Sequence, residues 1–129
     1  MSVGMSIYPT LRYTDATAAL AFLRGAFGMT EQHVSTTEDG TVGHAELSWG
    51  DGIVMVGTRT NPPDQFDTGR AVLYLPVDDV DAHHERALAA GAEIHAGLTD
   101  QPYGSREYAA LDPEGNNIWC FGTYRPSLD

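Results

Sequence analysis

Apolar and polar residues alternate along several short stretches of this chain, a pattern typical of half-buried β-strands. The first stretch covers residues 6–13, with Ile7, Leu11 and Tyr13 on one face and Tyr8, Thr10 and Arg12 on the other. Further alternating stretches, and short runs of β-branched and aromatic residues, predict more strands. They span residues 31–37, 43–49, 53–56, 71–77, 92–95, 104–111 and 118–121.

Two segments have apolar residues at helical spacing instead, recurring at intervals of three and four residues. The first predicts a helix that begins after Asp15, a good N-cap residue, and ends before Gly28, which can adopt the positive φ of a helix end. The second predicts a helix that begins after Asp78 or Asp79 and ends before Gly91. Both helices follow a predicted strand directly.

The order of one strand, one helix and three strands occurs twice, on either side of a segment containing Pro62-Pro63 that predicts no regular element. Specific residues recur with this order. Residues 15–28 match 78–91 at an offset of 63, residues 43–51 match 104–112 at 61, and residues 53–58 match 118–123 at 65. Three matches in the same order indicate an internal duplication.

These features together resemble the vicinal oxygen chelate superfamily, which includes glyoxalases, bleomycin-resistance proteins and extradiol dioxygenases. The matching segments are residues 11–15, 22–29, 44–51, 77–82 and 112–116. The resemblance covers nearly the whole chain and implies an α+β fold of two tandem βαβββ modules. Their mixed sheets would curl into a cup, with the helices on the outer face and the site inside. It also implies a homodimer.

On this basis we expect a single domain over residues 1–129. Module one would cover about 5–58, a linker about 58–69, and module two about 70–125.

The resemblance also says where a metal would bind. Metal-dependent members place His or Gln on the first strand of each module and Glu on the last strand of each. The corresponding positions here are Tyr8, Val72, Val54 (Met55 if the register slips by one) and Trp119. These side chains are poor ligands for a divalent cation. We therefore expect no metal and no cofactor, and none of the chemistry in which a metal polarises an oxygen atom.

Strand parity suggests which side chains face the cup. It predicts that Val72, Tyr74 and Pro76 face inward while Leu73, Leu75 and Val77 pack under helices. By the same reasoning Trp119 and Phe121 would face inward, and Ile118 and Cys120 outward. The ligand-binding candidates are Tyr8, Arg12, His44, Glu46, Tyr74, Tyr103, Glu107, Trp119 and Phe121.

Each candidate also has a purely structural interpretation. Trp119 and Phe121 could fill the cup, His44 and Glu46 could form a solvated strand face, and Tyr103 could lie in an exposed hairpin. The adjacent residues His83 and His84 lie about 100° apart on a helix, cannot chelate one ion together, and are expected at the surface.

Composition narrows the choice of partners. The 129 residues include 7 Lys+Arg and 18 Asp+Glu, for a net charge of −11. This charge argues against binding nucleic acid or an anionic membrane, and it suits either a cationic ligand or simple solubility. The single cysteine excludes an intramolecular disulfide. No signal peptide or membrane span is recognisable, so a soluble cytoplasmic protein is expected.

Two functions remain open. The first is a metal-independent protein that binds and sequesters an aromatic or cationic small molecule, as drug-resistance members of the superfamily do. The alternative is an enzyme, a lyase, isomerase or dioxygenase, with His44, Glu46 and Glu107 at a non-standard metal site or with His44 and Glu46 in acid–base catalysis. A regulatory module that has lost its pocket is a third possibility.

Overall fold

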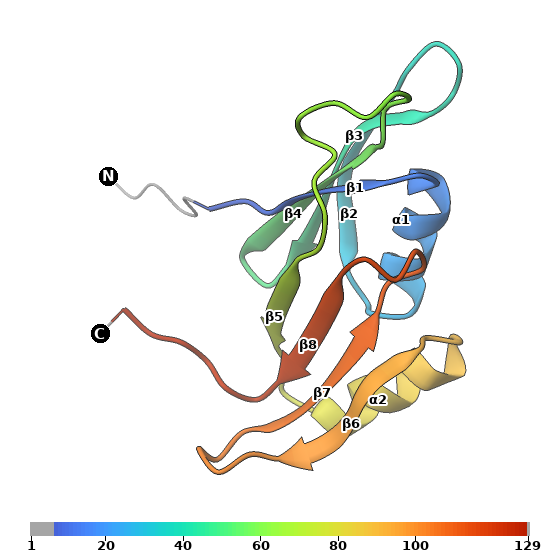
Figure 1. Ribbon diagram of the computed structural model, residues 1–129. Coiled ribbons are helices and arrows are strands. Elements are labelled where there is room, and N and C mark those ends of the chain that lie inside the picture. The colour runs from blue at the N-terminus through green and yellow to red at the C-terminus, as the bar shows by residue number, and fades with distance from the viewer. Residues whose placement is uncertain (1–6, 129) are drawn as a thin grey trace. The chain divides into compact units, whose positions relative to one another are not determined.

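A computed structural model describes residues 7–128 and divides the chain into two compact units, Met1–Thr68 and Gly69–Asp129 (Figure 1). The units are described separately below. No helix in the described part of the chain is long and apolar enough to cross a membrane.

The first unit is one helix on a four-stranded mixed sheet with the strand order β1-β4-β3-β2. Strand β1 pairs with β4 in parallel, and the other neighbours are antiparallel. The elements in chain order are β1 (Thr10–Tyr13), α1 (Ala16–Gly25), β2 (Thr30–Thr36), β3 (Val42–Trp49) and β4 (Gly52–Thr58).

The second unit repeats this arrangement, with the strand order β5-β8-β7-β6 and a parallel β5–β8 pair. Its elements are β5 (Val72–Pro76), α2 (Val80–Ala89), β6 (Ile94–Asp100), β7 (Arg106–Leu111) and β8 (Ile118–Gly122). The two units confirm the predicted α+β fold with a βαβββ order written twice.

Both helices begin directly after a predicted N-cap residue, and α2 ends just before Gly91, whereas α1 ends at Gly25, earlier than the predicted end before Gly28. The Asp15 carboxylate accepts a hydrogen bond from the Ala18 amide at 3.0 Å. Of the two aspartates offered for the second helix, Asp79 is the N-cap, and it accepts from the Ala82 amide at 3.0 Å. Gly91 lies just beyond α2 with a φ of 85°, and this positive φ costs glycine little conformational energy.

Two strands differ most from their predicted bounds. Strand β1 begins at Thr10 rather than residue 6, which lies outside the described residues, and Ile7 is 83% exposed. Pro9, which has no amide hydrogen to donate, immediately precedes the strand. Strand β6 extends to Asp100, well beyond the predicted end at His95, because irregular pairing with β7 tolerates Gly97 inside the strand.

The strand register defines two faces of the second sheet. Leu73 pairs with Trp119 and Leu75 with Phe121, and directly paired residues share a face. The ring of His83 on α2 lies 4.2 Å from that of Phe121, so this is the face that the helix covers. We call the opposite side the open face. It carries Val72, Tyr74, Glu107, Ala109, Leu111, Ile118, Cys120 and Gly122.

The prediction for β5 is therefore confirmed, and the prediction for β8 is wrong. Leu73 and Leu75 are buried while Val72 is 69% exposed. Trp119 and Phe121, however, are 0% exposed on the helix-covered face, and Ile118 and Cys120 lie on the open face. Alternation fixes which residues of a strand share a side. It does not fix which side faces the helix, and here the two large aromatic residues occupy the core.

The expectation of surface histidines on α2 is also wrong. His83 is half-buried, and its Nδ1 lies 2.6 Å from the Tyr108 hydroxyl. The ring of His84 meets that of Tyr108 edge-on at 4.9 Å. His83 lies three residues after Val80 and four before Ala87, both buried, so it belongs to the stripe of α2 that packs on the sheet.

Candidate ligand-binding site

A carboxylate held by two tyrosines marks one end of the open face of the second sheet. Tyr74 on β5 donates a hydrogen bond to Glu107 Oε2 at 2.8 Å, and Tyr103 donates to Oε1 at 2.6 Å. Tyr103 lies in the turn before β7, and Glu107 lies on β7 itself. The sequence predicted all three as ligand-binding residues, and the fold brings them together.

A third tyrosine, Tyr124, completes this group. Its backbone amide donates to Tyr74 Oη at 3.2 Å and to Ser105 Oγ at 3.1 Å. Its ring lies edge-on to Tyr74, with centroids 6.4 Å apart, and edge-on to Tyr103, at 6.2 Å. The three rings are 38% (Tyr74), 62% (Tyr103) and 50% (Tyr124) exposed. We call Tyr74, Tyr103, Tyr124 and Glu107 the tyrosine cluster.

Gly122 on β8 makes room for this cluster. A Cβ atom at Gly122 would lie 2.3 Å from the Tyr74 hydroxyl and 2.5 Å from Glu107 Cγ. Both distances are far shorter than van der Waals contact, so only glycine allows these two side chains to meet here. The strand predicted from the sequence ends at Phe121, directly before Gly122, and gives Gly122 no role in the site.

The cluster favours an ionised carboxylate beside neutral phenols. Burial raises the pKa of Glu107, but hydrogen bonds from Tyr103, Tyr74 and Ser105 together outweigh it and hold the pKa below its ordinary value of 4.5. The hydrogen bond to Glu107, with some burial, raises the pKa of Tyr103 to about 12. The pKa of Tyr74 is also raised, and burial is the main cause. At neutral pH the cluster therefore carries one negative charge among three aromatic rings.

Trp119 and Phe121, both predicted to contact ligand, have structural roles. The Trp119 indole nitrogen donates to Asp112 Oδ2 at 3.3 Å, and the same carboxylate oxygen accepts from the Asn117 side chain at 2.7 Å. The turn between β7 and β8 is thereby tied to the core. Phe121 stacks on Tyr108, with centroids 5.4 Å apart.

The candidates in the first unit make separate contacts, and only His44 and Glu46 pair with each other. Arg12 donates to Asp67 Oδ1 at 3.0 Å, and so joins β1 to the segment after β4. His44 Nε2 lies 2.9 Å from Glu46 Oε2 on β3, and both side chains are partly exposed. Tyr8 precedes β1 and is 44% exposed.

A family model described as the Glyoxalase/Bleomycin resistance protein/Dioxygenase superfamily matches residues 7–120. The chain belongs to this superfamily. The resemblance in the sequence motifs is therefore confirmed.

Individual relatives extend over most of the chain. An uncharacterized protein of Mycobacterium bovis is 32% identical over 130 residues, which span 95% of this chain and 85% of that protein. The crystal structure of TioX from Micromonospora sp. ML1 is 34% identical with a TM-score of 0.77, and the match covers 97% of this chain and 100% of TioX. A superfamily enzyme from Burkholderia phytofirmans PsJN is 21% identical with a TM-score of 0.68, covering 89% and 94%; this likeness shows the fold alone.

The residues present do not suit the metal of the superfamily's metal-dependent members. Within residues 7–128, no three His, Cys, Asp or Glu side chains lie close enough to hold a metal ion. On β8 the open face carries Cys120, paired with Tyr74, rather than Trp119. Burial and the nearby Glu107 charge raise the pKa of the Cys120 thiol, which disfavours the thiolate that binds metals.

Sequence reasoning missed Tyr124 and Gly122 as members of the site. Tyr124 follows the last predicted strand, 118–121, so strand alternation gives no information about which way it faces. The available signal was the match of residues 53–58 to 118–123, because it pairs Gly57 with Gly122 at the ends of both last strands.

Proposed function

We propose that this protein binds a small molecule with a cationic, aromatic end, without a metal, at the tyrosine cluster on the open face of the second unit. The observation that carries the proposal is the ionised Glu107 carboxylate set among the exposed rings of Tyr74, Tyr103 and Tyr124. Aromatic faces around a carboxylate attract cations through the ring quadrupoles and the charge together.

The carboxylate keeps room for a ligand. Tyr74, Tyr103 and Ser105 each donate a hydrogen bond to it, whereas an ionised carboxylate offers about four acceptor positions in all. An ammonium group can therefore approach Glu107 without displacing either tyrosine. Because the tyrosines already fix the carboxylate, little side-chain freedom is lost on binding.

The acidity of the whole chain supports the same ligand class. A net charge of −11 raises the local concentration of cations around the molecule and repels anions at long range. Sequestration of a cationic compound needs no catalytic group, which agrees with a cluster that offers recognition but no activated nucleophile.

Titration calorimetry with two naphthalene compounds tests the proposal. The cation (naphthalen-2-yl)methylammonium and the neutral 2-naphthalenemethanol share one ring system and differ in the head group. We expect the cation to bind at least about tenfold more tightly, as a charge-assisted contact adds over 1 kcal/mol. Equal affinities, or no saturable binding of the cation, would refute the proposal.

One observation favours an enzymatic alternative in the first unit. The His44–Glu46 pair, 2.9 Å apart, has the geometry of a general base oriented by a carboxylate. Elemental analysis of protein purified without chelators tests whether a metal assists it. A near-stoichiometric divalent ion that is lost in the His44→Ala variant would favour this alternative over simple binding.

A further inference from the structure

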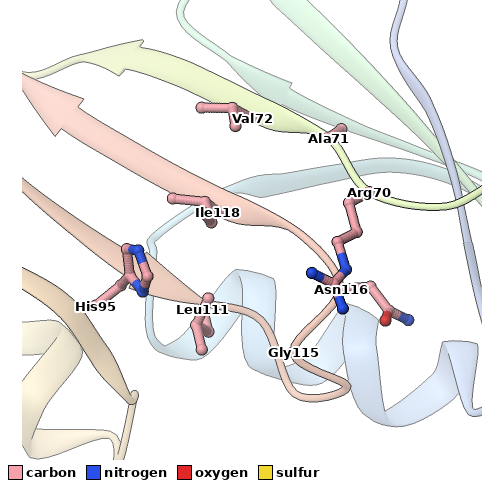
Figure 2. Close-up of a pocket in the computed structure, with 8 residues that line it drawn as sticks. All are labelled: Arg70, Ala71, Val72, His95, Leu111, Gly115, Asn116 and Ile118. Atoms are coloured by element: carbon pink, nitrogen blue, oxygen red, sulfur yellow. The ribbon is translucent and has the colours of Figure 1, made fainter.

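A cavity of about 380 Å³ opens at the other end of the same open face (Figure 2). Its floor is aliphatic and comes from three neighbouring strands: Val72 on β5, Ile118 on β8 and Leu111 on β7. Its volume falls within the range of about 300–1,000 Å³ typical of small-molecule pockets. Every residue lining it belongs to the second unit.

The polar side chains that line this cavity are hydrogen-bond donors or cations. Arg70, just before β5, extends its guanidinium toward Asn116 in the β7–β8 turn, and the two lie on one side of the floor (Figure 2). His95 on β6 lies on the other side, beyond Ile118 and Leu111 (Figure 2). No aspartate or glutamate lines the cavity, although the chain has 18 of them.

Arg70 differs from the other basic residues of the chain, all of which are arginines. Arg12 and Arg106 each pair with two aspartates, Arg24 and Arg125 with one carboxylate each, and Arg59 donates to two backbone carbonyls. Arg86 also has an interaction partner. Among the arginines of residues 7–128, only Arg70 has no side-chain hydrogen bond or ion pair, so in an acidic protein its guanidinium remains available at the rim of an apolar cavity.

We propose that this cavity binds the carboxylate end of an organic anion with a flat apolar body. The Arg70 guanidinium would hold the carboxylate in a bidentate pair, and the Asn116 amide would donate a further hydrogen bond. The apolar body would cover the exposed Val72 side chain together with Ile118 and Leu111. This site shares no residue with the tyrosine cluster, so either proposal can fail alone.

The net charge of the protein does not prevent such binding. At physiological ionic strength the Debye length is about 8 Å, so most of the negative surface is screened from a ligand in the cavity. What decides the affinity is the local pairing with Arg70 and the apolar contact below it. The long-range repulsion should slow association more than it weakens the final complex.

Two-dimensional amide NMR with 2-naphthoate as the probe tests the inference, with 2-naphthalenemethanol and inorganic phosphate for comparison. We expect saturable shifts of the amides of Ala71, Val72 and Ile118 with 2-naphthoate. The neutral alcohol should bind roughly tenfold more weakly because it lacks the charge-assisted contact, and phosphate should also bind more weakly because it lacks the apolar body.

Arginine variants locate the contact. Arg70→Gln should weaken 2-naphthoate binding by about tenfold or more, whereas a change of the exposed Arg86 on α2, Arg86→Gln, should leave it unchanged. Glu107→Gln should also leave it unchanged, which separates this site from the tyrosine cluster. The inference is overturned if 2-naphthoate does not bind, if the alcohol or phosphate binds as tightly, or if Arg70→Gln has no effect.

Discussion

Gly57 and Gly122 occupy corresponding positions in the two units and show how single residues shape the site. Each lies on the strand that comes last in its unit along the chain, β4 or β8, next to a long side chain from the unit's first strand, β1 or β5. A Cβ at Gly57 would lie 3.4 Å from Arg12 Cδ, and one at Gly122 would lie 2.3 Å from the Tyr74 hydroxyl. The duplication thus keeps a glycine beside this side chain in each sheet. In the second unit the Tyr74–Glu107 pair occupies the space beside that glycine.

Substitution of this glycine should disrupt the pair. We expect Gly122→Ala to lower the free energy of unfolding by about 1–3 kcal/mol, because the new methyl group overlaps Tyr74 and Glu107. Urea denaturation measures this change. The control is Gly97→Ala on β6, where a Cβ meets no atom within 4 Å, and we expect a change within about 0.5 kcal/mol. Equal destabilisation by both variants would contradict the close approach.

The ionisation of Tyr103 should report the charge on Glu107. A carboxylate that accepts from a phenol disfavours the phenolate, which is why the pKa of Tyr103 rises to about 12. Glu107→Gln removes the charge, so Tyr103 should ionise closer to its ordinary pKa of 10.0. Tyrosinate absorbance followed over a pH titration measures this, with Tyr103→Phe identifying the contribution of Tyr103. Identical curves for the wild type and Glu107→Gln would count against the hydrogen bond.

At the scale of elements, each helix packs on one face of its own sheet and leaves the opposite face without a helix. In the second unit α2 covers Phe121 through the ring of His83, while the open face carries both the tyrosine cluster and the cavity. On β7 Glu107 and Leu111 belong to these two features and lie four residues apart. This corresponds to about 13 Å along the strand. The open face therefore has a negative charge, Glu107, at one end and a positive charge, Arg70, at the other.

The start of α2 should depend on its N-cap. We expect Asp79→Ala to reduce the free energy of unfolding by about 1 kcal/mol, because the Ala82 amide loses its hydrogen-bond acceptor. Glu85→Ala on the exposed side of the same helix should change it by less than about 0.5 kcal/mol. Thermal or urea unfolding compares the two variants. If Glu85→Ala proves as harmful as Asp79→Ala, the cap is not what stabilises this helix.

Most elements were predictable because their signals are local. Asp15 and Asp79 cap the helices, and the alternation of Leu73 and Leu75 with Val72 and Tyr74 marks a strand with one buried face. The direction in which β8 faces was not predictable. Whether Trp119 or Cys120 points toward the helix depends on the parallel register between β8 and β5, which lie more than 40 residues apart in the sequence.

The candidate site was predictable in part for the same reason. Tyr74 and Glu107 were identified from their positions on predicted strands, and Tyr103 from the turn that precedes the predicted strand 104–111. Tyr124 was not, because it joins them through backbone hydrogen bonds after the last strand. Arg70 was not identified either, since what distinguishes it is the lack of a partner, and pairing between distant residues is invisible in the sequence.

For the whole molecule, charge and family membership together limit the function. The chain belongs to a superfamily that includes both enzymes and resistance proteins, and its described residues do not offer the metal site that the metal-dependent members use. The chain has only seven basic residues, all arginines, against 18 acidic ones, so little of its surface is cationic. The proposed cation site agrees with this overall field, and the Arg70 cavity is a local exception to it.

The central claim is that Glu107 and the surrounding tyrosines bind a cation. Its most direct test is the dissociation constant of (naphthalen-2-yl)methylammonium for the wild type and for Glu107→Gln, measured by calorimetry at pH 7. At that pH the lowered pKa of Glu107 keeps the carboxylate ionised. We predict binding that is weakened by about tenfold or more in the variant. Unchanged affinity in Glu107→Gln, in a protein that remains folded, would contradict the account.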